Sequence, residues 1–216
     1  MCENANNTLK EGKIKICDKV FSLYYIDEGD SSCPENDRTK YGLIGGKIAN
    51  YEGDEEKLSY WLNLLKEGCW CRTCHKLAKC LKSEAHFEDN IGNTIISVPS
   101  TTRSDIVDQL EQAFKDEFPH VKICLNILSK ITGLRFRGAS IEEIKNNLQN
   151  NPLYNKNSFV QIKKVLIIDN YYSRGVTMRA VYEKIMDLDL LRPNVEVLFA
   201  VPGKSKKRID YSSFLS

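Results

Sequence analysis

The residues best suited to chemistry lie in one stretch, VLIIDNYYSRGVT, at residues 165–177. Four apolar residues, typical of a buried strand, lead into Asp169, and a loop containing Gly175 follows before a helical pattern begins. A carboxylate at a strand end can accept hydrogen bonds from a vicinal diol. A loop of glycine and hydroxyl residues at a helix start offers backbone N–H groups and the helix dipole to a phosphate. Two interpretations remain open: a phosphate-binding loop, or an ordinary strand-to-helix connection in which Asp169 is a cap.

This stretch resembles the phosphoribosyl pyrophosphate (PRPP) signature of the type I phosphoribosyltransferases. In that signature a run of apolar residues leads into two acids, two variable residues and then Thr-Thr-Gly-x-Thr. Asp169 matches the first acid and Ser173 the first threonine. Gly175 matches the glycine, and Thr177 matches the last threonine.

The chain departs from the signature at two positions. Asn170 replaces the second acid, which removes one negative charge but keeps a group that can hydrogen-bond a hydroxyl. Arg174 replaces the second threonine, and its guanidinium either strengthens the grip on a 5′-phosphate or fills the pocket. We therefore expect phosphate recognition and leave catalysis open.

The resemblance implies a role for each matching residue. In the family the two acids hold the ribose hydroxyls, and Mg²⁺ bridges ribose and pyrophosphate oxygens, so the implied cofactor is Mg²⁺ with PRPP. The implied contacts are Asp169 and Asn170 for the ribose, Ser173, Arg174, Gly175, Val176 and Thr177 for the 5′-phosphate, and Ser100, Thr101, Thr102 and Arg103 for the pyrophosphate. Arg135 and Arg137 either close over the site or belong to a solvated basic loop.

Further segments are similar to the competence-associated ComF-like branch of this family. YGLIGGKIANYEGDEEKLSYWLNLL, residues 41–65, is similar to an early lysine-containing segment of that branch. IISVPSTTR, residues 95–103, resembles its pyrophosphate loop, and LRFRGAS, residues 134–140, lies where the branch has a basic flexible segment. The similarity covers about residues 41–203, and the signature is its one specific motif.

A second candidate constellation is a cluster of cysteines in CWCRTCHKLAKC, residues 69–80. Its thiols are those of Cys69, Cys71, Cys74 and Cys80. Thiolates at such short spacing can share a Zn²⁺ ion. The stretch also has helical character, and cysteines on a helix are often small buried apolar groups. Zinc and apolar packing both remain open.

The elements that position these residues follow from hydrophobic periodicity. We expect strands over residues 13–27, 94–99, 121–128, 164–169 and 195–202, with a helix as the alternative for 121–128. We expect helices over residues 53–68, 104–118 and 176–190, with Ser104 as an N-cap. Residues 132–163 are polar and predict a mobile segment with one short helix.

Strands that alternate with helices in the second half predict a parallel sheet with crossover helices. With the resemblance, the expected fold is α/β, with a Rossmann-like parallel sheet of the type I phosphoribosyltransferase kind. We expect residues 1–40 to form an N-terminal β and loop appendage and residues 41–216 the phosphoribosyltransferase-like domain. Ligands of such sheets bind beyond the carboxyl ends of the strands, where Asp169 is expected.

Composition excludes several classes of function. The 216 residues are 42% hydrophobic and 28% charged, which is ordinary for a globular protein. A net charge of +2 predicts neither a nucleic-acid binder nor a membrane-surface protein. No apolar run approaches the ~20 residues of a membrane span. The first residues carry no apolar core of a secretory signal, and eight cysteines without one suggest reduced thiols, so we expect a cytoplasmic protein.

Two function hypotheses follow from these features. The first is a phosphoribosyltransferase-like enzyme, a glycosyltransferase that uses PRPP to make or break an N-glycosidic bond of a nucleobase or nucleotide. The second is a non-catalytic nucleotide or PRPP sensor, or an effector subunit of a larger prokaryotic assembly for competence or retron-type defence. Protein or nucleic-acid partners would belong to that assembly. Asn170 and Arg174 favour the second hypothesis, whereas Asp169, Gly175 and Thr177 favour the first.

Overall fold

The computed structural model describes residues 9–28, 69–99, 105–124, 126–131, 136, 139–172 and 175–204. Its helices are α3 (Cys69–Ser83), α4 (Asp105–Glu117), α5 (Ile141–Asn146) and α6 (Val176–Asp187), with a 3₁₀ helix, η2 (Lys156–Phe159). Its strands are β1 (Lys10–Ile16), β2 (Lys19–Glu28), β3 (Asn93–Ser97), β4 (Lys122–Cys124), β5 (Leu128–Lys130), β6 (Leu148–Asn150), β7 (Lys164–Ile168), β8 (Tyr171–Tyr172) and β9 (Glu196–Lys204).

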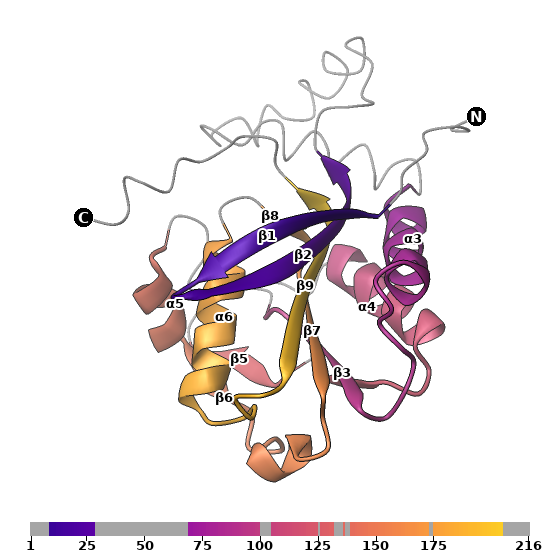
Figure 1. The fold of residues 1–216 in the computed structure, drawn as a ribbon. Coiled ribbons are helices and arrows are strands. Elements are labelled where there is room, and N and C mark those ends of the chain that lie inside the picture. The colour runs from indigo at the N-terminus through magenta and orange to yellow at the C-terminus, as the bar shows by residue number, and fades with distance from the viewer. Residues whose placement is uncertain are drawn as a thin grey trace.

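The described strands form a central, largely parallel sheet (Figure 1). Its order is β1-β2-β9-β7-β3-β4, and β8 pairs with the end of β9. Every pairing in this sheet is parallel except β1 with β2, which form an antiparallel hairpin. A separate antiparallel pair is formed by β5 and β6. The fold is therefore mixed α/β, as the sequence predicts, and is compatible with a Rossmann-like arrangement.

Strand β7 shows why a continuous apolar run forms a strand here. Val165 and Ile167 face one hydrophobic core, which also contains residues of α6. Leu166 and Ile168 face a second core, which contains residues of α3 and α4. Successive side chains of a strand point to opposite faces, so a strand covered on both faces has no polar alternation.

The helices cover opposite faces of the sheet (Figure 1). α6 packs Ala180, Val181 and Ile185 on one face, beside α5. α4 packs Leu110 and Phe114 on the other face, beside α3. Each helix therefore contributes one apolar side to a core, which is the pattern of an amphipathic crossover helix.

The sheet order reverses between β3 and β7. The chain leaves β3 through α4 and returns in β4, on one side of β3. It leaves β7 through α6 and returns in β9, on the other side of β7. Loops that diverge in this way from neighbouring parallel strands mark the place where α/β sheets bind ligands.

Most expected elements are confirmed. The strands expected over 13–27, 94–99, 164–169 and 195–202 correspond to β1–β2, β3, β7 and β9. The segment 121–128 forms the short β4 and leads to β5, so the strand interpretation is correct and the helix interpretation is wrong. The helices expected over 104–118 and 176–190 are α4 and α6, while the one over 53–68 and the N-cap at Ser104 lie outside the described residues.

Residues 139–163 contain more structure than the sequence predicts. The one short helix is α5, which begins with a capping box formed by Ser140 and Glu143. β6 and η2 follow, and Leu148 and Phe159 are buried in the core on the α6 face. The described part of this polar segment therefore packs onto the domain.

The N-terminal hairpin continues the central sheet. β2 pairs with β9 from Leu23 to Glu28, and Leu23 is fully buried. The strand region expected over residues 13–27 is therefore present as two strands, which share the sheet of the second half of the chain. The boundary expected near residue 40 lies outside the described residues and stays a prediction.

Candidate functional site

Asp169 follows the last residue of β7, at the carboxyl edge of the sheet. Its backbone N–H donates to the carbonyl of Ala200 at 3.2 Å. Its Oδ1 accepts a hydrogen bond of 2.7 Å from the backbone N–H of Asn170. The half-buried carboxylate thus caps the next peptide, as one of the two sequence interpretations requires, and its place at the sheet edge is compatible with the other, which stays a prediction.

The ends of β3 and β7 lie side by side. The backbone N–H of Val98 donates to the carbonyl of Ile168 at 3.0 Å, so the two strands stay paired up to Asp169. The segment that leaves β3 and the segment that leaves β7 therefore start from adjacent points. The pyrophosphate-loop residues predicted at this edge, Ser100, Thr101, Thr102 and Arg103, lie outside the described residues.

The chain beyond Asp169 runs along β9 before it enters α6. Tyr171 and Tyr172 form β8, which pairs with Gly203 and Lys204 of β9. Tyr172 is buried in the core on the α6 face. Tyr172 therefore packs in the interior of the domain.

Gly175 is the N-cap of α6 and has a left-handed backbone, with φ of 72°. A Cβ at this position would lie 2.7 Å from the ring and from the hydroxyl oxygen of Tyr172. Both the backbone conformation and the close approach require glycine. The sequence analysis attributes this glycine to phosphate binding. The structure adds a second reason, the close packing of Tyr172 on the glycine backbone.

The first turn of α6 has no anionic partner from its own sequence. It contains no acidic residue, and among the described residues no side chain caps it. Val176 and Thr177, the first two residues of the helix, are half-buried. The N-terminal end of a helix carries a partial positive charge and unpaired N–H groups. Ser173 and Arg174, which precede it in the predicted loop, lie outside the described residues.

Lys130 is a candidate that sequence reasoning misses. It ends β5, and its Nζ lies 3.6 Å from the centre of the Phe136 ring. Burial lowers the pKa of Lys130 to about 8, and the nearby negative charge of Asp169 opposes that shift. Phe136 belongs to the basic segment 134–140, whose arginines either close over the site or are solvated, and Arg135 and Arg137 lie outside the described residues.

No local pattern in the sequence marks Lys130. It belongs to LSK, three residues without periodicity, and its place depends on the pairing of β5 with β6. That pairing joins segments about twenty residues apart, because Lys130 pairs with Leu148. A positive charge whose pKa is influenced by the charge of Asp169 is therefore a finding of the structure alone.

The cysteine-rich stretch forms α3, which confirms its helical character. Cys74 is fully buried in the core between the sheet, α3 and α4, and burial raises the pKa of its thiol. The pKa of Cys80 is raised to about 11, mainly by burial and to a smaller extent by a hydrogen bond with Glu84. These environments favour the apolar alternative for Cys74.

Among the described residues, no three His, Cys, Asp or Glu side chains are placed to hold a metal ion together. Cys71 and Cys80 are half-buried free thiols, and the side chain of Cys69 lies outside the described residues. The zinc site therefore stays a prediction.

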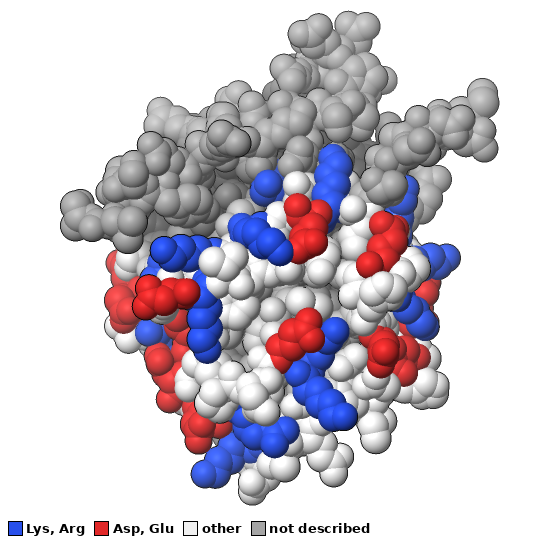
Figure 2. All heavy atoms as spheres, in the orientation of Figure 1, with Lys and Arg blue, Asp and Glu red and all other residues white. Residues whose placement is uncertain are grey.

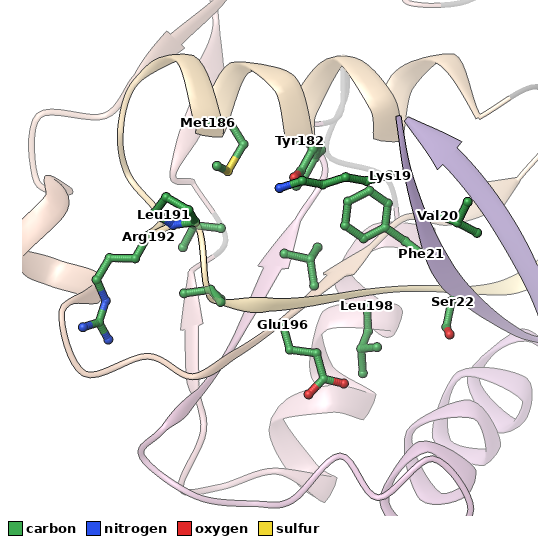
Figure 3. A pocket seen from close by; sticks show the side chains of 13 residues that line it. Lys19, Val20, Phe21, Ser22, Tyr182, Met186, Leu191, Arg192, Glu196 and Leu198 are labelled. Carbon is green, nitrogen blue, oxygen red and sulfur yellow. The ribbon is translucent and has the colours of Figure 1, made fainter. Parts of the chain in front are cut away.

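Two hollows lie away from Asp169. One, of about 340 Å³, opens where the start of β2 diverges from β9, and Phe21, Tyr182 and Met186 line it (Figure 3). The other, of about 550 Å³, lies at the amino ends of β3, β7 and β9, around Gly92 and Lys163. Neither contains a residue that the sequence assigns to the site.

The charged surface agrees with the low net charge. On the face shown in Figure 2, Lys and Arg side chains are interspersed with Asp and Glu side chains. None of the described helices is both long enough and apolar enough for a membrane span. Comparison with protein-family models and with curated protein sequences finds no match to this chain.

Proposed function

We propose that the protein binds a phosphorylated ribose, either PRPP or a nucleotide with a 5′-phosphate, at the carboxyl ends of β3 and β7. The observation that carries this proposal is the position of Asp169. It lies at the point where the sheet order reverses, and the chain continues from it through β8 to α6, whose first turn contains no acidic residue. This is where a parallel α/β sheet binds its ligand, and both ends of a phosphorylated ribose find suitable groups there.

The proposed contacts divide the ligand into three parts. Asp169 and Asn170 hold the ribose hydroxyls. Ser173, Arg174, Gly175, Val176 and Thr177 hold the 5′-phosphate, and Ser100, Thr101, Thr102 and Arg103 hold a pyrophosphate. The oxygens of Asp169 and Asn170 are of the type that Mg²⁺ prefers, so these two residues would also hold the ion. When bound, Mg²⁺ would neutralise the pyrophosphate.

We propose enzymatic activity of the phosphoribosyltransferase-like kind, as the resemblance implies. A nitrogen nucleophile would attack the anomeric carbon of PRPP, and pyrophosphate would leave. The chain would contribute positioning of the ribose and stabilisation of charge rather than a nucleophile of its own. The fold is compatible with this proposal, because the sheet and its crossover helices bring the signature segment to the carboxyl edge.

A second function, that of a non-catalytic sensor or effector subunit, is favoured by two observations at the same site. Asn170 leaves Asp169 without a second carboxylate, and Lys130 places a positive charge near Asp169. Both reduce the attraction of a divalent cation. Such a protein would bind the nucleotide or PRPP and pass the signal to a protein or nucleic-acid partner in a larger prokaryotic assembly.

Calorimetric titration tests the binding proposal. The purified chain is titrated with PRPP, AMP and pyrophosphate, each with and without Mg²⁺, and the titrations are repeated with Asp169→Ala. Asp108→Ala is the matched control, because Asp108 is an exposed acid on α4. We expect saturable binding of PRPP or AMP that Asp169→Ala removes and Asp108→Ala preserves. Absence of binding for every ligand would refute the proposal.

Release of pyrophosphate from PRPP in the presence of a panel of nucleobases separates the two functions. Release that depends on a base identifies the transferase. Tight binding of PRPP or AMP without any release, over the same panel, identifies the sensor.

A further inference from the structure

Lys130 is held in place by the β5–β6 pair. Leu128 and Leu148, at the two ends of the pairing, are buried in the core on the α6 face. Directly after Lys130, the backbone N–H of Ile131 donates to the carbonyl of Asn147 at 2.8 Å and lies 3.1 Å from its Oδ1. The backbone that carries Lys130 is therefore anchored on both sides.

The side chain of Lys130 is half-buried, and no described carboxylate forms an ion pair with it. Its Nζ lies over the Phe136 ring. Among the described residues, no carboxylate oxygen is closer to this Nζ than the 4.0 Å limit for an ion pair. Asp169 is near enough for its charge to act on Lys130. A desolvated ammonium without a partner costs free energy, and a bound anion would offset that cost.

Lys145 shows how this chain pairs another shielded lysine. Its Nζ lies 3.0 Å from Asp187, 3.4 Å from Glu183 and 3.6 Å from Glu142. Lys130 has no such set among the described residues. The contrast indicates that the ammonium of Lys130 is placed for a ligand rather than for a salt bridge with another described residue.

Resting on the proposed function, we infer that Lys130 is a ligand-binding residue of this site. Its ammonium binds phosphoryl oxygens of the phosphorylated ribose. The neighbouring ribose hydroxyls donate hydrogen bonds to Asp169. Phe136 holds the ammonium through its ring face, and the anchored β5–β6 pair limits the movement of the lysine stem. The carboxylate and the ammonium then recognise two neighbouring parts of one ligand, the diol and the phosphoryl group.

The test compares four proteins in calorimetric titrations with PRPP, AMP, ribose 5-phosphate and inorganic pyrophosphate. They are the wild type, Lys130→Met, Lys130→Arg and the control Lys122→Met. Lys122 also lies over aromatic rings, those of Tyr154 and Phe159, but at the start of β4. We expect Lys130→Met to weaken phosphoryl ligands about tenfold or more, because it removes a charge-assisted hydrogen bond. Lys130→Arg should retain most of the affinity, and Lys122→Met all of it.

The four ligands locate the phosphoryl group that Lys130 binds. A loss confined to PRPP and pyrophosphate supports the inference with the ammonium at the pyrophosphate. A loss that extends to AMP and ribose 5-phosphate supports it with the ammonium at the 5′-phosphate. Thermal unfolding followed by circular dichroism checks that each variant folds, and Lys130→Gln replaces Lys130→Met if the latter does not.

Failure of this inference is distinct from failure of the proposed function. If Asp169→Ala abolishes binding while Lys130→Met binds every ligand as tightly as the wild type, the function stands and the role of Lys130 is refuted. If the wild type binds none of the ligands, both are refuted.

Discussion

At the scale of single residues, Asp169 has two duties. Its carboxylate accepts a hydrogen bond from the backbone of Asn170 and is proposed to accept two from the ribose. The two duties can be separated by Asp169→Asn, because an amide oxygen still accepts from the Asn170 N–H but carries no charge. We expect Asp169→Asn to weaken PRPP or AMP binding about tenfold or more, since hydrogen bonds to charged groups are the stronger ones.

The same variant should fold almost as stably as the wild type. Urea unfolding followed by circular dichroism should place the free energies of unfolding of Asp169→Asn and the wild type within about 1 kcal/mol. Unchanged affinity in Asp169→Asn would contradict the ribose contact. Collapse of the fold in Asp169→Ala would show that Asp169 is a structural cap.

The pKa of Lys130 predicts a pH dependence of binding. Burial lowers this pKa from 10.5 to about 8, and among the described residues Asp169 is the charged group whose field acts on it. The ammonium is lost as pH rises through about 8, so the affinity for phosphoryl ligands should fall over that range. Lys130→Arg should bind with little pH dependence there, because a guanidinium stays charged. Titrations at several pH values measure both proteins, and parallel profiles would contradict the prediction.

The free energy of unfolding should change with pH in the opposite direction to the affinity. A lysine whose folded pKa is lowered binds its proton more weakly in the folded state than in the unfolded state. Its destabilising effect is complete below about 8 and is relieved as pH rises toward 10.5. The contribution of Lys130 to the free energy of unfolding should therefore increase as pH rises from about 8 to 10.5. Urea unfolding at several pH values should show that Lys130→Met lacks this pH-dependent increase.

At the scale of elements, the start of α6 depends on Gly175. A Cβ there meets a positive φ and a contact of 2.7 Å with Tyr172. Gly175→Ala should lower the free energy of unfolding by about 1–3 kcal/mol. Gly12→Ala is the control, since its Cβ would lie an ordinary 3.5 Å from Tyr25 and its φ is not positive. Equal urea midpoints for the two variants would contradict the close packing of Tyr172 on Gly175.

The cysteines of different elements should differ in reactivity. Cys17 is exposed in the turn between β1 and β2, whereas Cys74 is buried within α3. The number of thiols that react fast with a thiol-specific reagent should therefore fall by one in Cys17→Ser and stay unchanged in Cys74→Ser. Fast reaction at Cys74 would mean that α3 does not pack on α4 as described. Zinc analysis of the same preparations tests the metal prediction.

Local patterns predict the elements of the sheet and its helices well. β7 and α6 follow from runs whose apolar residues are close in sequence, and the register of a strand or helix face is fixed by those runs. The pairing of β5 with β6, the approach of Lys130 to Asp169 and the packing of Tyr172 on Gly175 depend on contacts between segments or on loop geometry. Periodicity carries no information on such contacts. The sequence therefore does not predict a role for Lys130 at the site, and it accounts for Gly175 only by phosphate binding and not by the packing of Tyr172.

At the scale of the whole molecule, two cores share one sheet. Phe114 lies in the core on the α4 face, and Ile185 lies in the core on the α6 face. We expect Phe114→Ala to cost about 3–5 kcal/mol and Ile185→Ala about 2–5 kcal/mol. Each variant should still unfold in one transition by circular dichroism, because β3 and β7 contribute side chains to both cores. Two separate transitions would contradict this coupling.

Binding of a phosphorylated ribose at the carboxyl ends of β3 and β7 is tested most directly by NMR. Amide chemical shifts of the isotope-labelled chain are followed as PRPP or AMP is added. The largest changes should occur at Val98, Asn170 and Gly175, and Asp169→Ala should abolish them. Changes centred instead on the hollow around Phe21 and Tyr182, or no changes with any ligand, would contradict the proposed site.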